Sequence, residues 1–386
     1  MGVQTEFRKK VLVTGATGLV GSSVIVALVK ANKNHDFICL TRQGAGQSAS
    51  ARVDRALREE CEFQGRAGLS DEVLRHVSAI DGEISALDVE ALANDRLLVG
   101  VDKVFHCAAD VNLGKDPKGN VLRTNLEGTR NIVALAKRIK ARELHYVSTA
   151  YAAGNTQGEI MEERLSLDRE FNNAYERSKC RAEDLVRASG IPFSIYRPGI
   201  IVGRTSDGRI RRPLAFYRVL EFLLKLKART AARRGCLPDQ MLEMKLNCPV
   251  PASKNIYFTP IDYVQESISC LLQKDAAGTT YHVTGDSPVT AHQIIDSTCE
   301  VLKISGMTVG LDSNHGTAED RTFAKCVGDL FPYMGTDMRF DQTNIRRDWK
   351  AGCELKYGSH DLKKMVRAYL QDDFRHIPWV NSLLGT

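Results

Sequence analysis

The chain has 386 residues, 43% of them hydrophobic and 26% charged, which is an ordinary balance for a globular protein. No window offers the roughly 20 uninterrupted apolar residues that a membrane-spanning helix needs. Ten cysteines are scattered singly, without Cys-x-x-Cys pairs or zinc-type histidine spacing, so we expect reduced thiols, a cytoplasmic location and no metal site. The first six residues lack the apolar segment of a secretory signal.

Short apolar runs alternate with helical patterns along the first 200 residues. Strands alternating with helices favour right-handed crossovers and a parallel, doubly wound sheet of the Rossmann type. Residues 255–258 and 280–283 are predicted as later strands of the same sheet, and the region 44–98 is predicted to be helical apart from one strand. Buried strands are predicted at 10–13, 37–40, 77–80, 101–106, 143–148 and 193–196, with helices at 23–30, 124–139 and 174–189.

Three glycines follow the first strand in the sequence Thr-Gly-Ala-Thr-Gly-Leu-Val-Gly, residues 14–21. Gly15 permits a tight turn, Gly18 lets the backbone approach a pyrophosphate, and Gly21 lets helix and strand pack closely. The start of the next helix then offers free N–H groups and a partial positive charge to phosphate. The strand, turn and helix context therefore predicts a dinucleotide-binding site.

The second strand is followed by Thr41, Arg42 and Gln43, with no acidic residue. Enzymes that use NAD place an acid here to bind the ribose 2′-hydroxyl, whereas a guanidinium suits a 2′-phosphate. We therefore expect NADP (NADPH) as the cofactor. A second interpretation, in which Arg42 only stacks on adenine, fits either cofactor.

Tyr175 and Lys179 are four residues apart on a predicted helix and so share one face. Lowering a tyrosine pKa from near 10 by about three units requires about 4 kcal/mol, roughly what a unit charge 4 Å away supplies at an effective dielectric of about 20. Ser148 and Thr149 follow the fifth strand, at the sheet edge where doubly wound folds bind ligands. A hydroxyl there, beside the tyrosine, can hydrogen-bond a substrate oxygen.

With these motifs in place, most of the chain resembles the extended short-chain dehydrogenase/reductase superfamily. The resemblance rests on residues 14–21, 105–109, 124–129, 147–149, 175–179, 196–199 and 259–263. It implies that Thr149, Tyr175 and Lys179 form a catalytic triad, with Ser148 a structural neighbour. The residues then expected at the cofactor are Gly15, Thr17, Gly18, Leu19, Val20, Gly21, Arg42, Arg52, Glu83, Ile84, Ala108, Ala109, Asn125, Tyr175, Lys179, Pro198, Gly199 and Ile200.

The resemblance also implies that the chain divides into two parts. Residues 1–203 plus about 255–285 would form the NADP-binding Rossmann domain. Residues of about 204–254 plus 286–386 are less regular and richer in helix, and would form a smaller substrate-binding lobe.

Within the superfamily, the chain looks most like the thioester reductase and fatty acyl-CoA reductase branch. The similar segments are residues 145–151, 39–42 with Ala51, Arg52 and Leu57, and 340–344. The branch implies reduction of an acyl thioester, on coenzyme A or a carrier protein, to an aldehyde; a second hydride would give an alcohol, and the choice between these two end points stays open. Ala150 and Tyr151 stand where sugar-nucleotide dehydratases carry acids, which disfavours elimination. An epimerase or ketone reductase acting on a nucleotide sugar, sterol or other free carbonyl remains the alternative, and a catalytically silent NADP-binding regulator a third hypothesis.

Residues 209–234 hold nine basic residues and one acid, Glu221, so this segment carries +8 while the whole chain carries +6. A basic surface beside the substrate lobe would attract coenzyme A phosphates or an acidic carrier protein. The same pattern is also typical of an interfacial helix on anionic membrane, or of a solvated helix with an apolar stripe toward the core. We expect no nucleic-acid partner, because no binding motif accompanies the charge.

Overall fold

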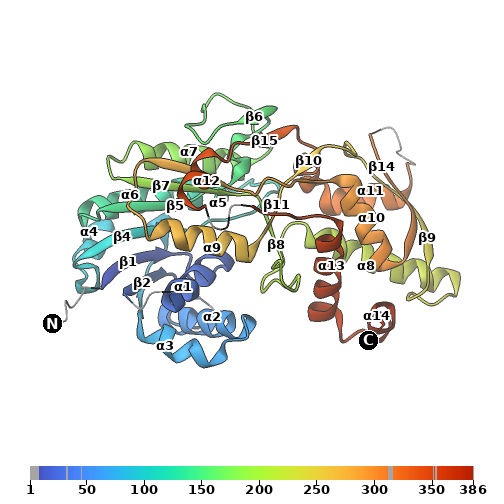
Figure 1. Ribbon diagram of the computed structural model, residues 1–386, viewed down its shortest axis with the longest axis horizontal. Coiled ribbons are helices and arrows are strands. Elements are labelled where there is room, and N and C mark those ends of the chain that lie inside the picture. Colours follow the sequence, from blue (N-terminus) through green and yellow to red (C-terminus); the bar gives the residue numbers. More distant parts are fainter. Residues whose placement is uncertain are drawn as a thin grey trace.

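The computed structural model describes residues 8–31, 34–44, 46–311, 316–350, 352 and 354–385. The expectation about the first six residues lies outside this part. Its centre is a parallel sheet, as the sequence predicts, and the seven strands lie in the order β12-β7-β5-β4-β1-β2-β3 (Figure 1). The strands are β1 (Lys9–Thr14), β2 (His35–Thr41), β3 (Val77–Asp81), β4 (Val101–His106), β5 (Glu143–Val147), β7 (Phe193–Pro198) and β12 (Thr279–Val283).

Along most strands, alternate residues enter two different hydrophobic clusters, one on each face of the sheet. On β1, Val11 and Val13 face one cluster while Leu12 faces the other. Both faces are therefore dry, which explains why the strands are nearly continuous apolar runs. One face packs on α1 (Leu19–Ala31), α2 (Ala49–Phe63), α3 (Ser70–Arg75) and α9 (Ile261–Leu272), and the other on α4 (Val89–Ala93), α6 (Gly128–Arg138) and α7 (Ala174–Arg187).

The prediction of a sheet strand at 280–283 is confirmed, but the one at 255–258 is wrong. Those residues split into β10 (Asn255–Ile256) and β11 (Phe258–Pro260), neither in the large sheet. β11 instead pairs in parallel with β8 (Ile200–Val202). The reason is that β12 already occupies the place beside β7. At Gly199 the chain also leaves β7 so closely against Tyr257 that an added Cβ would lie 2.5 Å from its carbonyl oxygen.

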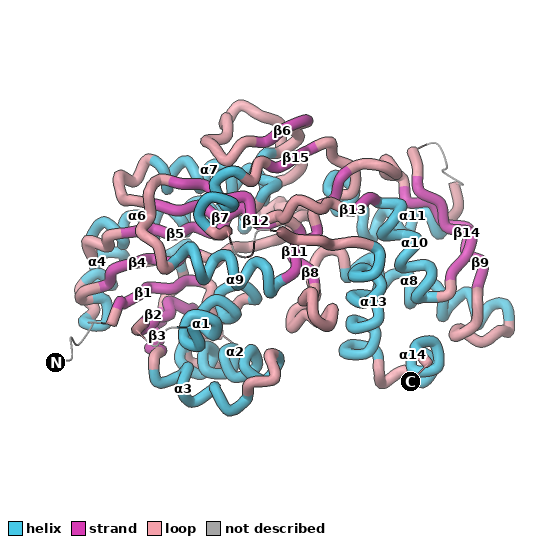
Figure 2. Tube along the Cα trace, in the orientation of Figure 1, coloured by secondary structure: helices cyan, strands magenta, loops and turns pink. Residues whose placement is uncertain are grey.

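The remaining chain lies beyond the sheet, on the right in Figure 2. β9 (Leu242–Cys248) and β14 (Ile304–Val309) form a parallel pair there, β13 (Val289–Thr290) pairs with β10, and β15 (Met338–Phe340) reaches back to pair with β6 (Gly158–Ile160). Within the described ranges, every helix is too short or too polar to cross a membrane. The helices of this part are α8 (Tyr217–Arg234), α10 (Ala291–Leu302), α11 (Ala318–Val327), α13 (Ser359–Phe374) and α14 (Pro378–Leu384), whereas α12 (Thr343–Asp348) lies against β12 of the large sheet (Figure 1).

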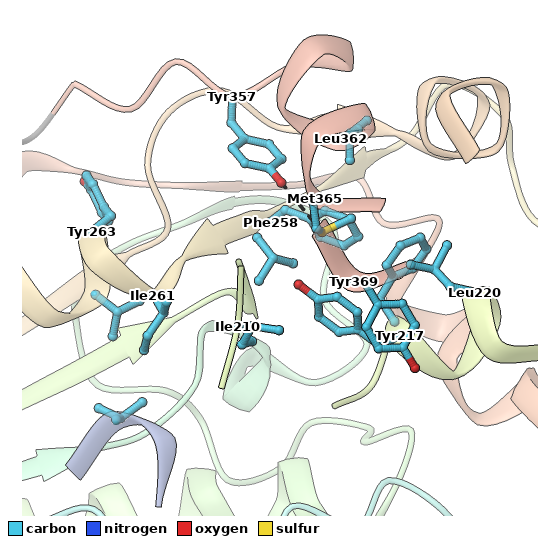
Figure 3. Close-up of a cluster of buried hydrophobic side chains, with 14 of the residues drawn as sticks. Ile210, Tyr217, Leu220, Phe258, Ile261, Tyr263, Tyr357, Leu362, Met365 and Tyr369 are labelled. Atoms are coloured by element: carbon cyan, nitrogen blue, oxygen red, sulfur yellow. Dashed lines mark hydrogen bonds between the residues drawn. The ribbon is translucent and has the colours of Figure 1, made fainter. Parts of the chain in front are cut away.

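The sheet and the later helices share one hydrophobic cluster (Figure 3). Phe258 and Ile261 enter it from the chain around β11, Tyr217 from α8 and Met365 from α13. The Tyr217 hydroxyl also accepts a hydrogen bond from the Gly203 backbone N–H at 2.9 Å. The two-domain division stays a prediction. Residues of both predicted parts share one continuous hydrophobic cluster.

A buried ion pair fixes α7 against β7 and the loop before it. Arg197 is fully buried and donates twice to the Glu183 carboxylate, at 2.9 and 2.6 Å. Its remaining donors reach the carbonyls of Met161 and Glu163. Because α7 carries Tyr175 and Lys179, this pair sets the position of two predicted catalytic side chains.

We predict that Arg197→Met lowers the free energy of unfolding by about 3–5 kcal/mol, because it leaves the Glu183 carboxylate buried without its cation. Urea denaturation followed by circular dichroism measures this. The matched control is Arg164→Ala, which removes a 2.5 Å ion pair to Asp184 on the outside of the same helix. That change should cost less than about 1 kcal/mol. Equal losses in the two variants would contradict the prediction.

Candidate active site

A cavity of about 880 Å³ opens at the carboxyl ends of β1, β4, β5 and β7. It lies where the strand order reverses between β1 and β4, the usual ligand position in doubly wound sheets. Of the predicted site residues, the wall includes Gly15, Thr17, Gly18, Leu19, Val20, Arg42, Arg52, Glu83, Ile84, Ala108, Ala109, Thr149, Tyr175, Lys179, Pro198, Gly199 and Ile200. Gly21 and Asn125 lie behind it.

The glycine turn is shaped by close backbone approach. Gly15 has a φ of +77°, and an added Cβ would lie 2.7 Å from the Ala108 nitrogen. A Cβ at Gly21 would lie 2.3 Å from the Gly15 carbonyl oxygen, so Gly21 serves helix packing. The Gly18 N–H closes the turn on the Gly15 carbonyl at 2.9 Å. The first turn of α1 therefore lies at the cavity wall, and its free backbone N–H groups fit a diphosphate.

Two arginines meet at the end of β2. Arg52 on α2 donates to the Arg42 carbonyl oxygen, and both side chains line the cavity. The Arg42 guanidinium lies 3.3 Å from the Glu83 carboxylate and is 69% exposed. A phosphate placed here would meet two cations and one acid.

Thr149 and Tyr175 meet on the floor of the cavity. Thr149 is the second residue after β5 and donates to the Pro198 carbonyl at 3.4 Å. Tyr175 stands in the first turn of α7, whose N-cap is Asn173. Burial raises the pKa of Tyr175 well above its usual value, and a hydrogen bond with Thr149 offsets only part of this rise. From the sequence we expect Lys179 to lower this pKa; in the structure burial dominates, and the phenol remains a proton donor.

Lys179 is 2% exposed and lies beneath the cavity. Its ammonium donates to the Val147 carbonyl at 2.7 Å and lies 4.7 Å from the centre of the Tyr146 ring. Burial lowers the pKa of Lys179 to about 8. The Lys179 ammonium therefore lies at the end of β5, and the residue lines the same cavity as Thr149 and Tyr175.

Asn125 sits in a single π-helical turn, Arg123–Glu127. Its side chain accepts from the Asp110 N–H at 2.7 Å and donates to the Asp110 carbonyl and to the Ser178 hydroxyl, both at 2.9 Å. It thus ties the loop after β4 to α7. Asn125 therefore lies behind the cavity wall, where it positions these two segments, and it does not line the cavity.

Ser148, expected from the sequence to be a structural neighbour of the triad, lies in the cavity wall, and several other wall residues escape prediction from the sequence. The Ser148 hydroxyl is buried, lines the cavity and has no hydrogen-bond partner among the described residues. One group of the other wall residues comes from two segments that lie far from the motifs in sequence, and no local pattern marks these residues. They are Leu214, Ala215, Phe216, Arg218, Asp329, Leu330, Tyr333 and Met334, with Arg212 beside them.

Several basic residues of the segment 209–234 form ion pairs with acidic residues elsewhere in the chain. Arg209 contacts Asp372, Arg211 contacts Glu59 and Glu60, Arg218 contacts Asp329, and Arg233 contacts Glu319. Lys227 is fully buried and donates to the carbonyls of Gln240, Leu302 and Lys303. The +8 count therefore overstates the free positive charge on this surface.

A phosphate-binding glycine turn and a Tyr-x-x-x-Lys helix at one cavity define an NAD(P)-dependent oxidoreductase of the extended short-chain dehydrogenase/reductase type. Residues 13–268 match the family model described as "Male sterility protein", and the chain belongs to this NAD-binding family. The predicted resemblance to the thioester reductase and fatty acyl-CoA reductase branch is confirmed.

Curated relatives include a linear gramicidin synthase of Brevibacillus parabrevis, 29% identical over 64% of this chain, and fatty acyl-CoA reductase wat of Drosophila melanogaster, 27% identical over 50%. The chain spans 5% and 43% of their lengths. Among solved structures, the terminal R domain of the myxalamid PKS-NRPS pathway has a TM-score of 0.75 at 21% identity, covering 96% of this chain and 92% of that one. UDP-glucuronic acid 4-epimerase of Bacillus cereus has a TM-score of 0.62 at 19% identity, covering 94% and 99%. These structures share the fold.

The low pKa of Lys179 predicts a pH-dependent stability. An unfolded lysine titrates near 10.4, so between about pH 8 and pH 10 the unfolded chain binds a proton that the folded chain has lost. The contribution of Lys179 to stability should therefore rise with pH across this window and be lower below it, by on the order of 3 kcal/mol. Lys179→Met should flatten the rise, as measured by urea unfolding at pH 7.5 and pH 9.5. An unchanged slope would contradict the burial of this charge.

Proposed function

We propose that the protein is an NADPH-dependent reductase of acyl thioesters that releases an aldehyde, and that further reduction gives an alcohol. The observation that carries this proposal is the convergence of Thr149, Tyr175 and Lys179 beside the glycine turn, with Ala150 and Tyr151 where elimination would need acids. Membership of the male sterility protein family and the similarity to a fatty acyl-CoA reductase support the choice of substrate.

The dinucleotide would supply a hydride to the carbonyl carbon when it is bound on the glycine turn. Thr149 and Tyr175 would hydrogen-bond the oxygen that becomes negative, which is where such donors lower the barrier. The raised pKa of Tyr175 suits this role, because a protonated phenol can donate to the oxyanion. Breaking the carbon–sulfur bond of the resulting hemithioacetal releases a thiol and the aldehyde. Lys179 would hold the cofactor ribose.

The far end of the cavity suits an apolar acyl group. Leu214, Phe216, Leu330 and Met334 line it. The first two precede α8, and the last two come from a 3-10 turn, Gly328–Tyr333, and the residue that follows it. Burial of such side chains against an acyl chain gains about 25 cal/mol per Å². Arg218 and Asp329, 2.6 Å apart, bridge these two walls.

The partner would be an acyl group carried on coenzyme A or on a carrier protein. One similar solved structure is titled a thiolation-reductase di-domain from an archaeal non-ribosomal peptide synthetase, which has this substrate context. The internal ion pairs of residues 209–234 support the interpretation of that segment as a structural helix more than as a membrane-binding surface.

The substrate is tested by offering NADPH with an acyl-CoA and following free thiol together with cofactor oxidation. We expect one thiol per aldehyde released. Tyr175→Phe should slow thiol release by at least about 100-fold, because it removes the proton donor at the oxyanion. Oxidation of NADPH by a ketone, without a thiol product, would favour the epimerase or ketone reductase alternative instead.

The NADP preference is tested separately at Arg42. Arg42→Ala should reduce the preference for NADP over NAD by about tenfold, because one cation at the 2′-phosphate is lost. The measurement is the dissociation constant of each cofactor, by quenching of protein fluorescence. An unaltered preference would support the interpretation that Arg42 only stacks on adenine.

A further inference from the structure

Residues 209–212 form a short strap that crosses from the substrate part of the chain to the glycine turn. The strap is fixed at three successive positions. Arg209 is tied to Asp372 at 2.7 Å, and Ile210 is 6% exposed within the hydrophobic cluster (Figure 3). Arg211, the third anchor, binds on the glycine-turn side.

The Arg211 guanidinium is surrounded by protein groups that accept its hydrogen bonds or pair with its charge. It donates to the Glu60 carboxylate at 2.7 Å, to the Ser22 hydroxyl at 2.6 Å and to the Gly18 carbonyl at 3.3 Å, and it lies 3.3 Å from Glu59. Only 6% of its side chain is exposed. Arg211 therefore attaches the strap to the first turn of α1, next to the N–H groups that face the cavity.

Arg212 is the next residue, and its side chain lines the cavity. The acid nearest to it is Glu59, at 3.9 Å, a carboxylate that Arg211 also contacts. Burial and the adjacent Arg211 lower the pKa of Arg212, so this cation is incompletely compensated by the protein. A ligand anion at the first turn of α1 would complete its environment.

We infer that Arg212 is a cofactor-binding residue that supplies a countercharge to the diphosphate of the dinucleotide. The glycine turn offers backbone N–H groups and the helix dipole but no cationic side chain, so a guanidinium delivered from the strap adds the missing full charge. Arg42 and Arg52 sit at the other end of the dinucleotide site, after β2, and serve a different group. The inference rests on a dinucleotide cofactor alone and not on the substrate proposed above.

The test separates the two phosphate subsites with fragments. ADP-ribose carries the diphosphate without a 2′-phosphate, and 2′-AMP carries the 2′-phosphate without the diphosphate. Isothermal titration of the full chain should show that Arg212→Ala weakens ADP-ribose binding by about tenfold and leaves 2′-AMP binding unchanged. Arg42→Ala should do the reverse.

Arg218→Ala is the matched control. Arg218 lines the same cavity and its side chain is 43% exposed, as is that of Arg212, but it is paired with Asp329 at the opposite end. This variant should bind ADP-ribose like the unchanged protein. Arg212→Lys, which keeps the charge and loses the fork of donors, should lie between the unchanged protein and Arg212→Ala.

Three outcomes would overturn the inference. They are unchanged ADP-ribose binding in Arg212→Ala, equal losses for ADP-ribose and 2′-AMP, or an equal loss in Arg218→Ala. Because no thioester is present, failure of the thiol-release assay leaves this result untouched. A raised KM for acyl-CoA in Arg212→Ala, with ADP-ribose binding intact, would move Arg212 to the substrate.

Discussion

The structure depends on a place where backbone packs on backbone. Gly21 meets the Gly15 carbonyl and Gly15 meets the chain after β4, and in both positions a single methyl group would overlap main-chain atoms. These contacts bring the start of α1 to the ends of β1 and β4. Every later element of the site is arranged around that fixed corner, including the strap that binds the Gly18 carbonyl.

Local pattern is enough to predict the sheet, the glycine turn and the side chains that meet beside it. Strands buried on both faces are apolar runs, the turn requires glycine at set intervals, and Tyr175 and Lys179 share a helix face, so each signal lies within about ten residues. The apolar wall cannot be predicted in this way. Phe216 and Met334 meet at one cavity although they lie far apart in the chain, and neither is distinguishable from an ordinary core residue in the sequence.

The failed prediction at 255–258 and the overstated charge of the basic segment have a common cause. Both predictions rest on the local sequence, which does not show which other segment of the chain will pack beside it. β12 holds the sheet edge that β11 would have needed, and acids on α2, α11 and α13 neutralise arginines that cluster in the sequence. Charge and strand propensity describe what a segment can do, and tertiary partners decide which of those options it takes.

The buried contact between Arg211 and Glu60 also bears on how the molecule folds. Glu60 is 3% exposed and its carboxylate depends on a guanidinium from a residue 151 positions later. Removing residues 204–386 would take that cation away and would uncover the apolar residues that α8 and α13 bury in the shared hydrophobic cluster. The first 203 residues therefore depend on the rest of the chain for part of their packing.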